Sequence, residues 1–205
     1  MSTISASTTS TTAYKVTADT TGALVLQTGA GPTTAVTISS DQKVTFANPI
    51  QGGSITSGTA VASTSGTSID FTGIPSWVKR ITVMFNGVSL SASTELLLQI
   101  GSGSVETSGY LSGAGNRGGD TTSTAGFVVT RGFGLSENAS GYVSLVTLGS
   151  NIWVSSGVLC PTATGTFFGS GGNKTASGVI DRVRITSVSG TATFDAGSIN
   201  ILYEG

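Results

Sequence analysis

Short stretches of alternating apolar and polar residues recur along the chain, separated by glycine, serine, asparagine and proline. Because successive side chains of a strand point to opposite faces of a sheet, this alternation predicts half-buried β-strands. The apolar positions are rich in valine, isoleucine and phenylalanine, and helix-forming runs of alanine, leucine, glutamate and lysine do not occur. We therefore expect an all-β protein.

The first group of strands, within residues 13–50, is short, and each strand carries only a two-residue apolar stripe. A lone β-meander of this kind is marginally stable in water, because its stripes have nothing to pack against. The pattern therefore predicts a meander whose apolar face must be covered by something else. The stripe residues are Leu24, Leu26, Val36, Ile38, Val44 and Phe46.

The second group begins at residue 68 and is richer in apolar residues. Ile69 and Phe71 share one face, and Asn86-Gly87 predicts a tight turn after a long strand. The spacing of roughly 10 to 20 residues between strands, with no helix between them, predicts an antiparallel, jelly-roll-like β-sandwich. Further strands are expected at 95–100, 127–130, 142–148, 152–159, 179–188 and 199–203.

Composition divides the chain into four parts. Residues 1–12 form a Ser/Thr-rich tail, residues 13–50 the meander, residues 51–67 a Gly/Ser/Thr linker, and residues 68–205 the sandwich domain. Charged residues make up only 9% of the chain, against about 25% in ordinary soluble domains. We therefore expect a hydroxyl-rich and nearly neutral surface.

Charge and hydropathy argue against two classes of partner. The net charge is -1 and the basic residues are scattered, so we expect no binding to nucleic acid. Apolar runs are far shorter than the roughly 20 residues that span a bilayer, and the first residues do not have the pattern of a secretion signal. We expect no membrane insertion, and assembly inside a cell.

The residue types also restrict the chemistry. The chain has no histidine, which excludes Ser-His-Asp and Cys-His catalysis and every histidine-containing metal site. Its single cysteine, Cys160, is interpreted as a small hydrophobe at a strand end rather than a reactive thiol. We expect no catalytic residues, no metal and no cofactor.

Two glycine-rich strings imitate nucleotide-binding motifs. Residues 113–118 fit G-x-G-x-x-G, and residues 169–175 resemble a phosphate-binding loop. The residues after each string cannot form the helix that would hold a phosphate. We interpret the first string as a flexible loop and the second as a surface turn.

Exposed aromatic residues could stack on sugars, and the candidates are Trp77, Tyr110, Tyr142 and Trp153. The sequence favours a core position for Trp77. Tyr110 lies in a glycine-rich segment, where a buried and an exposed side chain are equally compatible with the pattern.

Two parts of the chain resemble virion appendage proteins of tailed bacteriophages. The segment 14–49, with TADTTGALVLQTG and AVTISSDQKVTF, resembles the N-terminal portions of tail fibres. The later part, which begins SIDFTGIPSWVKRITV and ends INILYE, is similar to a phage appendage domain. Together these parts cover most of the chain.

The resemblance implies a non-enzymatic virion protein, assembled in the bacterial cytoplasm as a homotrimer that docks onto other phage structural proteins. Its six stripe residues would meet at a threefold axis, and the sandwich would face outward towards a host surface glycan or protein. The candidate receptor contacts are Tyr110, Asn116, Arg117 and Tyr142. The chain is short for a host-range fibre, so two alternatives stay open: a head decoration or cement protein, and a carbohydrate-binding module.

Overall fold

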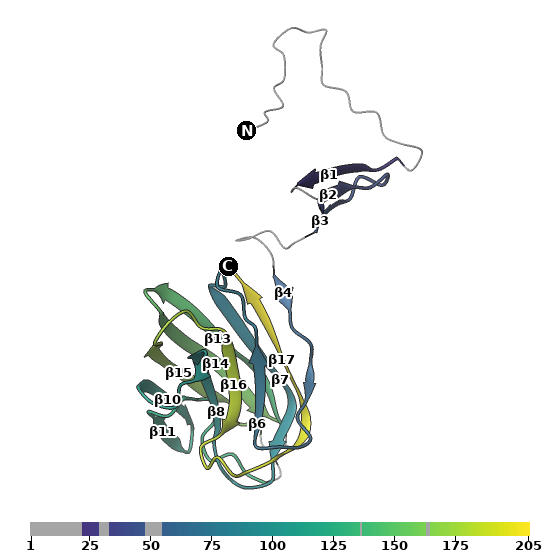
Figure 1. The fold of residues 1–205 in the computed structure, drawn as a ribbon. Helices are drawn as coiled ribbons and strands as arrows, with labels where there is room; N and C mark the ends of the chain where they lie inside the picture. Colours follow the sequence, from purple (N-terminus) through teal and green to yellow (C-terminus); the bar gives the residue numbers. More distant parts are fainter. Residues whose placement is uncertain (1–21, 29–32, 48–54, 136, 163–164) are drawn as a thin grey trace, which may run out of the picture. The chain divides into compact units, whose positions relative to one another are not determined.

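The computed structural model contains two compact units, residues 1–50 and residues 51–205. Every regular element in the described part of the chain is a β-strand, which confirms the all-β prediction (Figure 1). No helix there is long and apolar enough to cross a membrane. The structure describes residues 22–28, 33–47, 55–135, 137–162 and 165–205.

The first unit is a three-stranded antiparallel meander in the order β1-β2-β3. Its strands are β1 (Leu24–Thr28), β2 (Thr33–Ile38) and β3 (Val44–Phe46). The turn between β2 and β3 is closed by a hydrogen bond from the Ser39 amide to the Lys43 carbonyl, at 3.0 Å. The predicted meander is therefore present, whereas the predicted tail 1–12 lies outside the described residues.

The second unit is a sandwich of two antiparallel sheets. In the larger sheet, which has nine strands among the described residues, the order is β11-β10-β15-β14-β13-β7-β17-β4, and β5 also pairs with β17. The strands are β4 (Thr56–Ser57), β5 (Val61–Ala62), β7 (Arg80–Leu90), β10 (Tyr110–Asn116), β11 (Gly119–Ser123), β13 (Ala139–Gly149), β14 (Ile152–Pro161), β15 (Phe168–Thr175) and β17 (Phe194–Glu204).

The smaller sheet has the order β12-β8-β16-β6, with β9 paired to β8. The chain passes from this sheet to the larger one between β6 and β7, returns between β7 and β8, and passes over again between β16 and β17. Such crossings are expected of a jelly-roll-like sandwich. The strands are β6 (Ser68–Thr72), β8 (Leu96–Ser102), β9 (Ser104–Val105), β12 (Phe127–Val128) and β16 (Arg182–Ser187).

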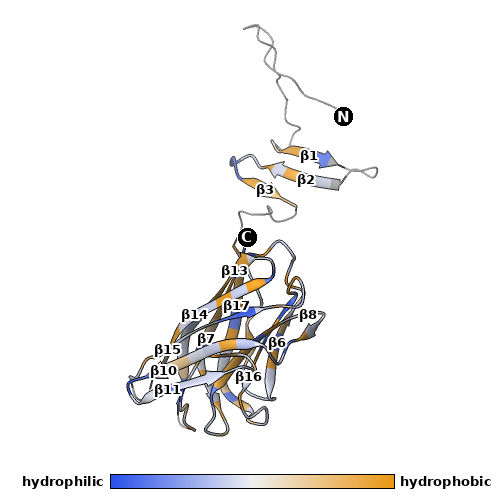
Figure 2. Cartoon of the chain, turned by 90° about the vertical axis from the view of Figure 1, so that its left-hand side faces the viewer, coloured by the Kyte–Doolittle hydropathy of each residue, from blue (hydrophilic) through white to orange (hydrophobic). Residues whose placement is uncertain are grey.

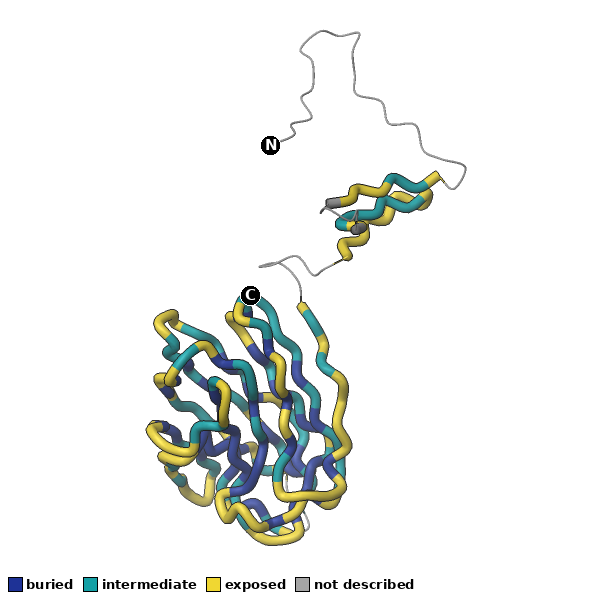
Figure 3. Tube along the Cα trace, in the orientation of Figure 1, coloured by how far each residue is buried: buried dark blue, intermediate teal, exposed yellow. Residues whose placement is uncertain are grey.

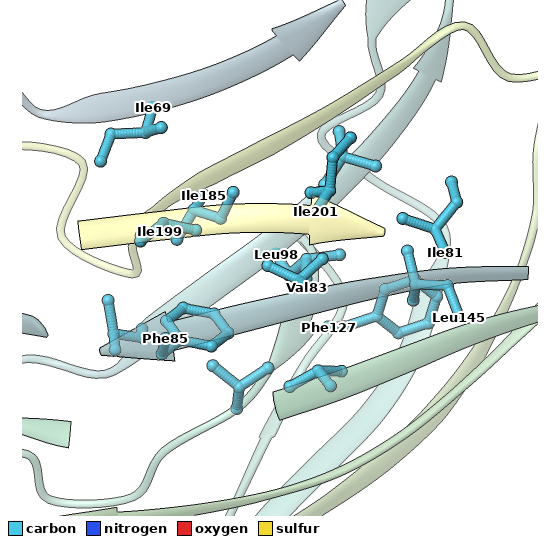
Figure 4. Packing of buried hydrophobic residues seen from close by; sticks show 14 of the residues in the cluster. Ile69, Ile81, Val83, Phe85, Leu98, Phe127, Leu145, Ile185, Ile199 and Ile201 are labelled. Carbon is cyan, nitrogen blue, oxygen red and sulfur yellow. The ribbon is translucent and has the colours of Figure 1, made fainter. Parts of the chain in front are cut away.

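One continuous hydrophobic core lies between the two sheets. It is built by alternation: Ile81, Val83 and Phe85 of β7 point inward, and the residues between them do not. Leu98 and Ile185 face them from the smaller sheet (Figure 4). Buried residues therefore concentrate inside this unit (Figure 3), and the sandwich has a core of its own.

The predicted turn at Asn86-Gly87 is wrong, because β7 continues through both residues. Gly87 has a φ of +61° and lies where the pairing of β7 with β13 and β17 is irregular. Across the strand pair, a side chain on Gly197 would lie 2.4 Å from the Gly87 carbonyl oxygen. The glycines therefore form a bulge within the sheet instead of a hairpin.

Three other expectations are corrected. Residues 51–67 were predicted to be a linker, but two of their described segments, Thr56–Ser57 and Val61–Ala62, are strands that pair with β17. The strings 113–118 and 169–175 are not a loop and a turn, since both lie largely in the neighbouring strands β10 and β15. Glycine-rich strands are stable here because strands on both sides of each satisfy their backbone hydrogen bonds. The strands expected after residue 90 all overlap observed ones.

Candidate functional site

The six stripe residues of the meander lie on one face and form two rows across the strands. Leu24 pairs with Ile38, which pairs with Val44, and Leu26 pairs with Val36, which pairs with Phe46. Residues paired in this way share a face of the sheet. We call this set the apolar face: Leu24, Leu26, Val36, Ile38, Val44 and Phe46.

The apolar face is open to solvent. Leu26 is 48% exposed, Val44 50% and Phe46 46%, and the first unit shows no buried residue among those described (Figure 3). The opposite face carries Thr37 and Thr45 together with Val25, which is 44% exposed, so it is the more polar of the two faces. Hydrophobic colouring is visible on β3 in Figure 2. This much clustered apolar surface marks an interaction surface more often than a free one.

The outer face of the larger sheet has a second unusual feature. Gly113 pairs with Gly171 and Gly115 pairs with Gly169, between β10 and β15. In each strand the residue between the two glycines points the other way, so all four glycines lie on the outer face. We call this patch of bare backbone the glycine trough: Gly113, Gly115, Gly169 and Gly171.

Side chains flank the glycine trough in two cross-strand rows. On one side, Val158 pairs with Gly169 and Tyr142 pairs with Val158; Tyr142 is 59% exposed and Val158 50%. On the other side, Asp120 pairs with Gly115 and Thr122 pairs with Gly113. The trough therefore has one aromatic and aliphatic wall and one wall of oxygen acceptors.

Two hollows lie along this face. One of about 230 Å³ is lined by the four glycines together with Asp120 and Thr122. The other, of about 450 Å³, is lined by Tyr142 and Val158 with serine, threonine and arginine side chains. The outer face is therefore hollowed on both sides of the row that joins Val158 to Gly169.

Tyr110 is not a surface residue, so its assignment as a receptor contact is wrong. Its side chain is fully buried and packs edge-on against Phe127, with ring centres 5.0 Å apart. Its hydroxyl accepts a hydrogen bond from the Ile100 amide at 2.8 Å and lies 2.9 Å from the Glu106 carbonyl. Burial raises the pKa of Tyr110 well above its usual value. Tyr110 therefore ties the β9–β10 segment to the core.

A largely buried ion pair lies beside Tyr110. Lys174 Nζ is 2.7 Å from Glu106 Oε2 and 5.3 Å from the centre of the Tyr110 ring. The Glu106 carboxylate also accepts hydrogen bonds from the amide and the hydroxyl of Ser177. Burial acts to raise the pKa of Glu106, but the bonds from Lys174 and Ser177 outweigh it and hold the pKa below its usual value. With its bonds satisfied, this cluster has a structural role.

The other predicted receptor residues lie on or near the outer face. Tyr142 is on β13, separated from the glycine trough by Val158 of β14, and Arg117 is exposed between β10 and β11. Asn116 is half-buried, and its side-chain oxygen accepts a hydrogen bond from the Gly118 amide at 2.7 Å, which shapes that turn. The structure thus places Tyr142 on the same outer face as the trough, one strand beyond Val158, and places Asn116 and Arg117 at the tip of the hairpin that forms the acceptor wall.

Two other aromatic candidates serve the fold. Trp153 is 4% exposed and belongs to the core. Trp77 is half-buried and packs against Tyr203, with ring centres 6.0 Å apart. Cys160 is half-buried near the end of β14, close to its predicted environment. These residues give no reason to place a binding site on them.

Sequence reasoning missed the glycine trough because it took the first glycine string for a flexible loop and the second for a surface turn. A signal was present in the alternation G-x-G at 113–115 and again at 169–171, which puts glycines on one face of a strand. Asp120 was also missed, because only the pairing of β10 with β11 brings it beside Gly115.

The described residues contain no group of three or more Cys, Asp or Glu side chains that could hold a metal ion. Comparisons with protein-family models, with curated protein sequences and with solved structures found no match to this chain. Functional inference therefore depends on the two surfaces described above.

Proposed function

We propose that this chain is a non-enzymatic structural protein of a bacteriophage particle, a short fibre or appendage assembled as a homotrimer. The observation that carries the proposal is the apolar face of the meander. This face has six apolar side chains in two cross-strand rows, and three of them are about half exposed. No residue with an assigned burial in the described part of this sheet is buried, so its apolar side chains stabilise it fully only when another layer covers them.

Other copies of the same chain can cover the apolar face. In a closed ring each copy offers the same surface to its neighbours, so every apolar face is covered and none remains free. A fully buried large apolar side chain contributes about 1.5 to 3 kcal/mol, so covering the remaining exposed area in three copies amounts to well over 10 kcal/mol before ordering costs. The resemblance to tail fibres supports three copies in place of two.

The surface chemistry is consistent with a particle component. Only 9% of the residues are charged, and the net charge is -1. Contacts made by such a surface depend little on exposed ion pairs, which salt screens. In this proposal the meander docks and trimerises, and the sandwich is the displayed domain.

Light scattering of the purified full chain and of residues 51–205 tests the oligomer. We expect three copies for the full chain and one for residues 51–205. If the full chain is a monomer, a dimer or a tetramer, the proposed trimer is wrong. A shorter chain that stays trimeric would move the interface to the sandwich and remove the role proposed for the apolar face.

The location in the particle needs a separate test. Antibodies raised against residues 51–205 and coupled to gold should label the tail in electron micrographs of the encoding phage. Labelling spread over the head would replace the fibre with a head decoration protein. Peptide mass spectrometry of gradient-purified particles should detect the chain. If it does not, the virion role is refuted.

A further inference from the structure

We propose that the outer face of the larger sheet binds a neutral oligosaccharide, which lies over the glycine trough against Tyr142. The site comprises the trough, the ridge of Tyr142 and Val158, and the acceptor wall of Asp120 and Thr122. The biological role of this binding rests on the proposed display of the sandwich, whereas the binding itself does not.

The fold alone does not explain the glycines of the trough. All four have a φ outside the left-handed region. A Cβ on Gly169 would meet nothing within 4 Å, and on Gly171 and Gly113 its nearest neighbours would be at 3.5 and 3.4 Å; only Gly115, at 3.3 Å, is tight. Glycine weakens a strand and often marks a bulge, a tight bend, or the close approach of a ligand or another backbone. The register of β10 with β15 has no shift that would mark a bulge. The openness of the trough therefore indicates an occupant from outside the chain.

The other glycines of this sheet show the contrast. A Cβ on Gly157 would lie 2.7 Å from the Tyr142 carbonyl oxygen, and one on Gly172 would lie 2.6 Å from the Leu111 carbonyl oxygen. Those two positions require glycine for packing within the chain. The glycines of the trough carry no such requirement, with the partial exception of Gly115.

The walls have the chemistry that a sugar needs. An exposed tyrosine ring offers a flat apolar surface on which the C–H face of a pyranose can pack. Opposite it, the Asp120 carboxylate and the Thr122 hydroxyl can accept hydrogen bonds from sugar hydroxyls. Val158 and Asp120 lie on strands three spacings apart, about 14 Å, so the trough is wide enough for a sugar chain.

Charge on this face favours a neutral ligand. Among the residues that line the two hollows, the charged ones are Asp120 and Arg80. Arg80 is paired with Glu204 at 2.7 Å, so its charge is compensated. A sulfated or phosphorylated glycan in the hollow of the trough would meet the Asp120 carboxylate, and the residues that line this hollow include no lysine or arginine. Arg117 and Arg131 lie near the hairpin tip, outside this lining. The lining therefore disfavours acidic glycans.

Binding of the full chain to immobilised oligosaccharides tests the proposal. The probes are gluco-, manno-, galacto- and N-acetylglucosamine oligomers, with heparin fragments as the acidic comparison. Tyr142→Ala should weaken binding at least tenfold, and Gly171→Thr should weaken it at least as much by filling the trough. The control is Leu148→Ala, which removes an exposed side chain from the outer face of the same strand, six residues away, and should bind like the wild type.

The substitution in the trough gives an additional signature. Gly171 is half-buried, but a Cβ there would make only ordinary contact, at 3.5 Å. Because threonine suits such a strand position better than glycine, Gly171→Thr should keep or raise the melting temperature while it abolishes binding. Gly171→Ala should give a smaller loss of binding. These opposite effects on stability and binding separate a blocked site from a misfolded protein.

The outcomes are distinct. Binding to a neutral oligomer that Tyr142→Ala and Gly171→Thr both remove supports the proposal. No binding to any neutral probe, binding to heparin fragments alone, or binding that survives both substitutions overturns it. Light scattering of the same samples reports the trimer independently. A trimer that binds no sugar refutes this inference and leaves the proposed function standing. A monomer that binds sugar supports this inference and refutes the proposed trimer.

Discussion

The two units use the same kind of strand with opposite results. In the sandwich, Val83 and Phe85 alternate with outward residues and are almost completely buried, because a second sheet lies over them. In the meander, Leu26 and Phe46 alternate in the same way and stay about half exposed. An apolar stripe is therefore buried only where a second layer packs against it, and the presence of that layer within the chain decides whether the unit is stable alone.

The comparison separates folding from assembly. The sandwich can draw its stability from contacts within one chain, so its unfolding should not depend on protein concentration. The meander, as proposed, draws its stability from neighbouring copies, so its stability should rise with protein concentration. Substitutions and a change of pH can test this separation, from the largest expected effect to the smallest.

Phe46→Asp should have the largest effect. It would place three like carboxylates together in the proposed trimer contact, at a cost of several kcal/mol for each copy. We expect the mass in light scattering to fall to one third, with the melting temperature of the sandwich unchanged. The matched control is Thr45→Asp, on the opposite face of the same strand, which should remain trimeric. A trimer that survives Phe46→Asp would contradict the role of the apolar face.

Phe127→Ala should destabilise the sandwich by about 3 to 5 kcal/mol, because it leaves a cavity at a fully buried ring. Denaturant unfolding at two protein concentrations measures the effect, and the loss should be the same at both. A loss below about 1 kcal/mol, or one that depends on concentration, would show that the sandwich does not have an independent core.

Lys174→Met should cost about 2 to 4 kcal/mol, because it leaves the largely buried Glu106 carboxylate without its ion-pair partner. The double variant Lys174→Met with Glu106→Gln should recover part of this loss, since no charge is then left unpaired. If the double variant is less stable than Lys174→Met, the penalty does not come from the unpaired carboxylate.

Acid should weaken the sandwich through the same carboxylate. The pKa of Glu106 is lower in the folded protein than its usual value of 4.5, so the unfolded chain binds the proton more readily. Its contribution is therefore complete above that value and is lost as the pH falls through the folded pKa. Glu106→Gln should flatten the fall in unfolding free energy between pH 6 and about pH 3. A slope equal to that of the wild type would contradict this assignment.

The smallest effect is expected for Asp70→Asn. Arg184 donates two hydrogen bonds to Asp70, at 2.6 and 2.8 Å, but both side chains are more than a third exposed. Such pairs contribute about 0 to 1 kcal/mol, and salt screens them. We expect a loss below about 1 kcal/mol, and little change in the melting temperature of the wild type between low and high salt. A large salt dependence would mean that ion pairs carry more of the stability than this surface suggests.

Several features could be predicted because they depend on short-range pattern. Alternation placed the six residues of the apolar face on one side of the meander, and their pairing in two rows agrees with that prediction. The inward residues Ile69 and Phe71 are likewise buried. The same reasoning failed where glycine interrupts a strand, because a glycine-rich string has the same composition in a loop and in a strand flanked by neighbours.

What the sequence by itself determined is which residues share a face, since the two-residue period of a strand is a local property of the backbone. What only the tertiary structure decided is which strands are neighbours. That pairing buried Tyr110, turned Asn86-Gly87 into a bulge, and brought Gly113 beside Gly171 from 58 residues further along the chain. Hydrogen bonds between strands can join segments at any separation along the sequence, so a local pattern does not determine which strands pair.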